Sequence, residues 1–149
     1  MAEALMMRSD LQKKLESLKT RIESNATKRE GKNAIEDPTE LLGEAQATIQ
    51  EISTLVSNIN RKNVEYKLSD GTTLAAALEE RDHLKKMHSI ISAALNAAQP
   101  QNRLFDSNSQ ADPALDLKAF RKQADVVAQK IRERNVAIQQ ANWTVDMAT

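Results

Sequence analysis

The sequence contains no cysteine and is poor in glycine, proline and aromatic residues. The absence of cysteine excludes disulfide bonds, thiolate metal sites and a cysteine nucleophile. Three glycines and three prolines provide little material for the turns of a sheet-rich fold. Aromatic residues make up 3% of the chain, so a core must consist mainly of Leu, Ile, Val, Ala and Met. This composition predicts an all-α protein.

The chain also has no excess of charge of either sign. Lys plus Arg and Asp plus Glu number 21 each, which gives a formal net charge of zero. Because nucleic-acid-binding proteins usually carry a basic excess or a basic stripe, we expect no nucleic-acid partner. No apolar run approaches the roughly 18 residues of a membrane span. The start of the sequence, MAEALMMRSDLQKK, does not resemble a secretory signal, so we expect a cytoplasmic protein.

Apolar residues recur at helical spacing in four segments. The predicted helices run from Ala2 to about Ala26, from Pro38 to about Asn60, from Thr73 to about Ala98, and from Asp112-Pro113 to about Asn142. Helix starts are indicated by Asp37 before Pro38, by Thr72 or Thr73, and by Asp116 as a later cap. A chain of 149 residues is a usual size for one domain. We therefore predict a single domain, 1–149, that forms an antiparallel four-helix bundle.

One or two short β segments are expected between the helices. Val64, Tyr66 and Leu68 alternate with polar residues, and the turn signal Ser69-Asp70-Gly71 follows them. In the polar loop from Gln99 to Asp112, Leu104 and Phe105 either anchor the loop or form a second short strand. One short strand is not stable alone, so its need for a partner favours self-association. The tail that contains Trp143, the one tryptophan, is expected to dock on the helices.

The sequence shows no nucleophile elbow, phosphate-binding glycine loop or zinc signature. Glu80 and His83 form an E-x-x-H step, the spacing used in di-iron helical bundles. Such a site needs a second E-x-x-H step and two more carboxylates, and Lys85 stands where the glutamate before His88 would be. We therefore predict no metal site, no cofactor and no catalytic residue.

Three polar residues interrupt the apolar faces of the predicted helices: Arg81, His88 and Arg134. Buried charge is costly unless it is paired and hydrogen-bonded, and Asp82, Asp125 and Glu133 are possible partners. One interpretation is an ion-pair network that fixes helix register within the bundle or between subunits. The other is a small-molecule or anion pocket between helices. The candidate network or pocket consists of Arg81, Asp82, His88, Asp125 and Arg134.

Several short motifs carry a resemblance to a known family. They are INRKN at 59–63, LSDGTTL at 68–74, ALEERD at 77–82, FRKQAD at 120–125 and IQQANW at 138–143. With these motifs the chain resembles the septicolysin-like family of small uncharacterised bacterial proteins. The residues we single out as a candidate structural motif are Asn60, Arg61, Asn63, Asp70, Gly71, Asn142 and Trp143.

The resemblance implies a small helical protein without an assigned reaction. The family label suggests a cytolysin, but a thiol-activated pore-forming protein needs a cysteine, which this chain lacks. The sequence favours a non-enzymatic, self-associating structural or interaction module that forms a homo-oligomer. One alternative is a small-molecule or anion-binding bundle, enzymatic or not, that uses the inward Arg and His. A second is a membrane-active protein.

Overall fold

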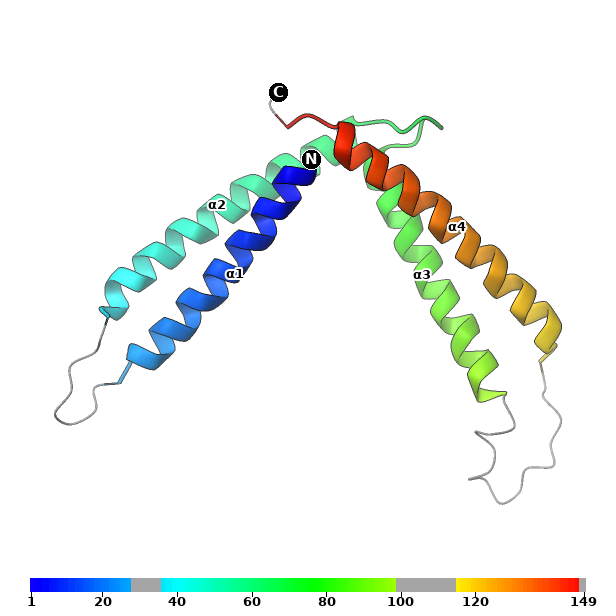
Figure 1. Cartoon of the computed structure of the whole chain (residues 1–149), viewed down its shortest axis with the longest axis horizontal. Helices are drawn as coiled ribbons and strands as arrows, with labels where there is room; N and C mark the ends of the chain where they lie inside the picture. Colours follow the sequence, from blue (N-terminus) through cyan, green and yellow to red (C-terminus); the bar gives the residue numbers. More distant parts are fainter. Residues whose placement is uncertain (28–35, 99–114, 148–149) are drawn as a thin grey trace, which may run out of the picture. The chain divides into compact units, whose positions relative to one another are not determined.

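A computed structural model describes residues 1–27, 36–98 and 115–147 of the chain. It contains four long helices, which are α1 (Ala2–Asn25), α2 (Pro38–Glu65), α3 (Leu74–Ala97) and α4 (Leu117–Thr144) (Figure 1). The prediction of an all-α protein with four helices is confirmed. The chain divides into two compact units. The first unit holds Met1–Tyr66 and the chain from Asn142 onward, and the second holds Lys67–Ala141.

Three helices begin at the capping residues that the sequence indicates. The Asp37 carboxylate accepts a hydrogen bond of 2.8 Å from a backbone N–H of the first turn of α2, and Pro38 follows it. The Thr73 hydroxyl accepts one of 3.2 Å at the start of α3. The Asp116 carboxylate accepts two, of 2.9 and 3.0 Å, at the start of α4. These bonds satisfy N–H groups that have no partner within the helix. The start predicted at Asp112-Pro113 lies outside the described residues.

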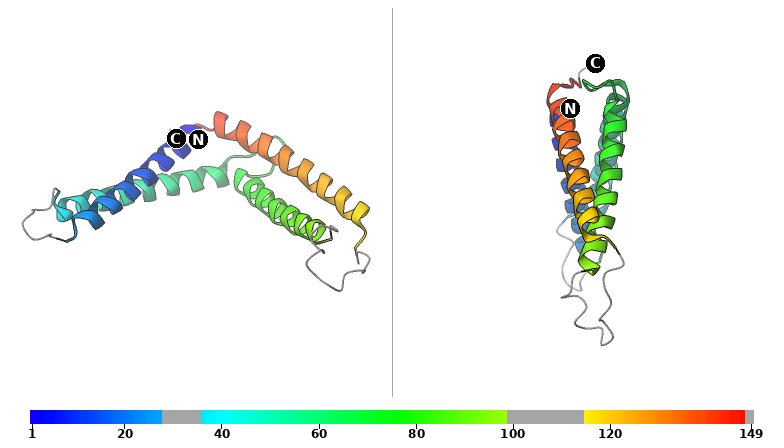
Figure 2. Two further views of the ribbon diagram at one scale, coloured as in Figure 1. Left: turned by 60° about the horizontal axis from the view of Figure 1, so that its bottom comes forward. Right: turned by 90° about the vertical axis from the view of Figure 1, so that its right-hand side faces the viewer.

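In the first unit, α1 and α2 pack side by side as an antiparallel pair (Figures 1 and 2). Leu18, near the end of α1, packs with Leu41 and Ala45, which lie near the start of α2. Leu15 and Ile22 cover the same cluster from one turn before and one turn after Leu18. The apolar stripe of α1 is therefore paired with the stripe of α2, as the spacing of both predicts.

The C-terminal tail closes the other end of the first unit. The Met1 ammonium group donates a buried hydrogen bond of 2.6 Å to the Val145 carbonyl oxygen, and the Val145 side chain is buried. The Tyr66 and Thr144 hydroxyls lie 3.1 Å apart. The tail is therefore docked, as the sequence predicts, but Trp143 does not anchor it, because this residue is 77% exposed. Val145 holds the tail in place, two residues beyond Trp143.

The second unit pairs the start of α3 with the end of α4. Its buried apolar side chains are Leu74, Ala77 and Ile91 on α3, and Val127, Ile138 and Ala141 on α4. An ion pair of 2.7 Å joins Glu80, in the second turn of α3, to Arg134 on α4. Because an early residue of α3 meets a late residue of α4, the two helices run antiparallel, as both views in Figure 2 show.

The first predicted β segment does not form a strand, and its first two residues, Val64 and Glu65, belong to α2. α2 continues to Glu65, five residues beyond the predicted end, so Val64 is helical and exposed. What remains is an isolated antiparallel bridge between Lys67 and Thr73. The alternation of apolar residues over 64–68 is too short to form a sheet without a partner strand, whereas helical hydrogen bonds are available locally. The second predicted segment, around Leu104 and Phe105, lies outside the described residues.

Within the described ranges, no helix is both long enough and apolar enough to cross a bilayer. This agrees with the absence of a membrane span that the sequence predicts.

We predict that Leu18→Ala lowers the free energy of unfolding by about 2–5 kcal/mol, because it deletes a fully buried side chain and leaves a cavity against α2. Met6→Ala removes a side chain of similar size from the same helix, but Met6 is 66% exposed. That control is expected to change stability by less than about 0.5 kcal/mol. Urea denaturation followed by circular dichroism measures both variants. Equal losses would contradict the assigned core.

Candidate functional site

Arg134 is the centre of the best-defined polar cluster in the second unit. Its Nη1 lies 2.5 Å from Asp70 Oδ2, and its Nε lies 2.7 Å from Glu80 Oε2. The Arg134 side chain is 23% exposed, so the guanidinium group is half-buried between its two partners. The side chain therefore links α4 both to α3 and to the turn that precedes α3.

The turn at Asp70 is shaped to present this carboxylate. Gly71 adopts a φ of +84°, a conformation that other residues rarely take. The Leu68 N–H donates to the Thr72 carbonyl at 2.8 Å, and the Gly71 N–H donates to the Leu68 carbonyl at 2.9 Å. Asp70 Oδ1 accepts hydrogen bonds from the backbone N–H and the hydroxyl of Thr72. These bonds leave Oδ2 directed at Arg134.

The same contacts keep both partners charged. The hydrogen bond from the Thr72 hydroxyl, followed by that from Arg134, holds the pKa of Asp70 well below its usual value. In return, the hydrogen bond to Asp70 raises the pKa of Arg134 above its usual range. Asp70 and Arg134 therefore remain an ion pair at neutral pH.

The positive charge of Arg134 is already compensated by carboxylates of the protein. Arg134 has two carboxylate partners, and Lys130 and Glu133 line the same hollow of about 350 Å³. An anion would have to displace Asp70 or Glu80 to reach the guanidinium group. The arrangement favours a role in holding the two helices and the turn in register.

The other members of the candidate network make separate contacts. Arg81 binds the carboxylate of its neighbour Asp82 through two hydrogen bonds, of 2.9 and 2.8 Å, and this pairing lowers the pKa of Asp82. His88 Nδ1 lies 3.4 Å from the Ser92 hydroxyl one turn later. Asp125 is exposed on α4. Arg134 is thus the residue of the set that joins different elements.

The residues of the candidate structural motif fall at two places. Asp70 and Gly71 form the turn that binds Arg134. Asn60, Arg61 and Asn63 lie in the last turns of α2, with Asn60 and Arg61 exposed and Asn63 half-buried. Asn142 and Trp143 lie at the end of α4, where they line a pocket of the first unit.

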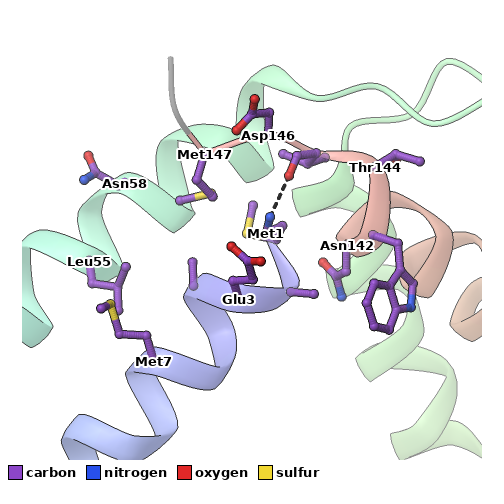
Figure 3. Close-up of a pocket in the computed structure, with 13 residues that line it drawn as sticks. Met1, Glu3, Met7, Leu55, Asn58, Asn142, Thr144, Asp146 and Met147 are labelled. Carbon is purple, nitrogen blue, oxygen red and sulfur yellow. Dashed lines mark hydrogen bonds between the residues drawn. The ribbon is translucent and has the colours of Figure 1, made fainter.

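This pocket has a volume of about 630 Å³ and lies between the start of α1, the later part of α2 and the tail (Figure 3). Its walls combine apolar side chains with amide and carboxylate groups. They include Met1, Glu3, Met7, Leu55, Asn58, Asn142, Asp146 and Met147. A volume of this size is typical of small-molecule sites. Among the described residues, no group of three or more His, Asp or Glu side chains is placed to hold a metal ion.

Sequence reasoning considered Glu80 as part of an E-x-x-H step and Thr72 as a possible cap, but it did not assign either to the Arg134 cluster, and it missed the pocket. Glu80 lies beside Arg81 on α3 and follows Ala77 by three residues, so its position near the packed face was available as a signal. Thr72 stands two residues after Asp70, the spacing at which an aspartate binds its own turn. The pocket has no sequence signal, because it forms where the tail returns to the first turn of α1.

Arg134→Met is expected to lower the urea midpoint of unfolding, because it leaves Asp70 and Glu80 without their shared partner. Arg132→Met makes the same chemical change at an exposed position of the same helix and should have little effect. Equal midpoints for the two variants would show that Arg134 does not hold the helices together.

Stability is expected to depend on pH through Asp70. A carboxyl group whose pKa is lower in the folded state stabilises the fold above its unfolded pKa, ordinarily 3.8, and this contribution is lost as pH falls through the folded pKa. Asp70→Asn should therefore be less stable than the unmodified protein at neutral pH, with a difference that shrinks as pH falls below the ordinary value. Asp125→Asn, at an exposed carboxylate of α4, is the control. Urea titrations across an acid pH series measure the difference, and a constant difference would contradict this assignment.

Comparison with known proteins places the chain among proteins without an assigned activity. A crystal structure of a functionally unknown conserved protein from Corynebacterium diphtheriae is similar, with 34% sequence identity and a TM-score of 0.89. The similarity covers 97% of this chain and 95% of that one. No curated protein matches. Residues 8–147 match the profile of a family of unknown function. The chain therefore belongs to this family, DUF6847.

Proposed function

We propose that the chain is a non-enzymatic helical module that associates with further copies of itself. The observation that carries this proposal is the incomplete burial of the apolar stripes. In each unit, several large apolar residues of the helices stay partly exposed. They include Leu11, Leu15, Ile52 and Leu55 in the first unit, and Leu84, Leu95, Phe120 and Ile131 in the second.

A pair of helices cannot enclose its own core, because each helix shields only one side of the other's apolar stripe. In a four-helix bundle, the same positions face three other helices and are removed from water. Within the described residues, the buried Leu and Ile side chains of the helices are Leu18, Leu41, Ile59, Leu74, Ile91 and Ile138, so most of the other Leu and Ile side chains on the stripes keep contact with solvent. A further layer of helices would bury the remaining stripes, and association of copies supplies such a layer.

The polar residues support a structural role over a catalytic one. Arg134 and Arg81 both bind carboxylates of the same chain, so neither presents an uncompensated charge to a substrate. The contact of His88 is with the Ser92 hydroxyl one turn later on its own helix, at 3.4 Å. These groups resemble the register-fixing ion pairs that helical assemblies use.

The alternative to a self-associating module is a helical bundle that binds a small molecule, and the pocket of the first unit favours it. The pocket of the first unit is large enough for a ligand and has both apolar and polar walls. An anion site at the inward Arg and His is less well supported, because Arg134 is already held by Asp70 and Glu80.

Septicolysin-like membership, a cytoplasmic location and the absence of a nucleic-acid partner stay predictions from the sequence.

The membrane-active alternative would require apolar side chains to be presented to lipid. Met6 and Met7 on α1 are exposed, but acidic and basic residues surround them along the helix, which disfavours stable insertion.

We predict that light scattering coupled to size-exclusion chromatography gives a discrete multiple of the 16.6 kDa chain mass. Because the contact is expected to be apolar, raising the salt concentration should not dissociate it. A single chain mass at all concentrations would refute self-association and make the pocket of the first unit the leading site.

A further inference from the structure

The pocket of the first unit continues into a second hollow between α1 and α2. The pocket has a volume of about 630 Å³ and the second hollow one of about 520 Å³. Both are lined by Met7 of α1 and by Leu55 and Asn58 of α2, so they adjoin at these residues, which Figure 3 labels. We call the two hollows together the α1–α2 groove, which runs from the tail to Leu11 and Ala47. All of its lining residues belong to the first unit, so the groove is a feature of that unit alone.

The groove follows one flank of each helix. On α1, the lining residues Glu3, Met7 and Leu11 succeed one another at intervals of four. On α2, the lining positions from Ala47 to Asn58 recur at intervals of three and four, which keeps them on one flank. The helix rises about 16 Å between those two residues, at 1.5 Å per residue. An elongated groove of this kind suits a linear molecule better than a compact one.

The two ends of the groove differ in polarity. The far end is formed by the apolar side chains of Leu11 and Ala47 with a few polar neighbours. The end at the tail adds the Glu3 carboxylate, the Asn142 amide and the indole ring of Trp143. Binding sites place a small number of polar groups so that they fix the orientation of an otherwise apolar ligand. A molecule with a polar head and one apolar chain matches this arrangement.

The charges along the groove select the sign of that head. Among the described residues that line it, the charged side chains are the carboxylates of Glu3, Glu51 and Asp146, and no Lys or Arg takes part. The Met1 ammonium group also lies there, but it already donates a hydrogen bond to the Val145 carbonyl oxygen. Glu3 forms no ion pair with another described residue. A cationic head would therefore gain a partner, whereas an anionic head would be repelled.

We infer that the α1–α2 groove binds one molecule of a single-chain organic cation, with its ammonium head at Glu3 and its alkyl chain along Leu11 and Ala47. Met7 lies where the two hollows meet, and the flexible, unbranched methionine side chain adapts readily to an alkyl chain. The ligand is a free molecule, because a groove between two helices accommodates one chain at a time. This inference goes beyond the proposed self-association, since the whole site lies within one chain.

Trp143 provides a reporter for binding, because it is the one tryptophan of the chain and lines the head end of the groove. Its fluorescence is titrated with decyltrimethylammonium below the critical micelle concentration, and calorimetry gives the stoichiometry. We expect saturable binding of one molecule per chain. Decanesulfonate, which has the same chain and the opposite charge, should bind about tenfold more weakly or worse. Equal affinity for the two, or tighter binding of the sulfonate, would overturn the assignment of a cation.

A series of chain lengths tests the apolar part of the site. From hexyl- to decyltrimethylammonium, each methylene group that enters the groove should lower the dissociation constant roughly two- to fourfold. Tetramethylammonium, which is the head alone, should produce no saturation at the same concentrations. A dissociation constant that does not change with chain length would contradict a chain bound in the groove.

Two pairs of variants locate the head and the chain. Glu3→Gln removes the partner of the head and should raise the dissociation constant roughly three- to fivefold. Glu23→Gln, at an exposed carboxylate of α1 outside both hollows, is its control. Ala47→Phe fills the far end of the groove and should abolish the gain from longer chains. Gln46→Phe, one position away and outside the hollow, is the matched control. Circular dichroism verifies that all four variants stay helical.

The outcomes decide for or against this site. One-to-one binding that Glu3→Gln and Ala47→Phe weaken, while their controls do not, supports the inference. Binding that all four variants leave unchanged would refute the groove as the site, and so would the absence of any fluorescence change or heat of binding. Co-sedimentation with phosphatidylcholine vesicles without binding of the free cation would overturn the assignment of a free ligand. Self-association is measured by solution mass, which these titrations do not use, so each proposal can fail without the other.

Discussion

The constraint on which this structure depends is that two helices cannot bury their own apolar stripes completely. Each unit contains a helix pair, and in each several large apolar side chains of the two helices are only half-buried. α2 shows the consequence most clearly, because it has an apolar side toward α1 and a second one away from it. A chain built in this way gains more from a further helical layer than a closed bundle does.

Polar contacts set the register of elements that apolar packing leaves free to slide. In the second unit, one guanidinium group holds α3 and the Asp70 turn against α4. In the first unit, the Met1 ammonium group fixes the tail through Val145, and Arg21 pairs with Glu36 at the opposite end of the α1–α2 layer. Because such pairs are directional, they define where each apolar stripe meets its neighbour.

Local signals in the sequence predicted the helices and most of their starts, since capping and periodicity act over a few residues. Asp37, Thr73 and Asp116 cap helices as their residue types indicate. The polar network was harder to predict, because its partners depend on which residues meet across the fold. Arg134 was recognised from its place on an apolar face, but its partners Asp70 and Glu80 lie 64 and 54 positions away in the sequence. The prediction of a short strand was wrong for a related reason. Alternation of apolar and polar residues over 64–68 indicates a strand only if a partner strand exists.

The most direct test of the account is the dependence of thermal unfolding on protein concentration. If association completes the core, the unfolding midpoint should rise as the chain concentration increases, because assembly stabilises only the folded state. An unfolding midpoint that does not change when the chain concentration is raised about a hundred-fold would contradict the account. Each pair of helices would then be stable without the added layer.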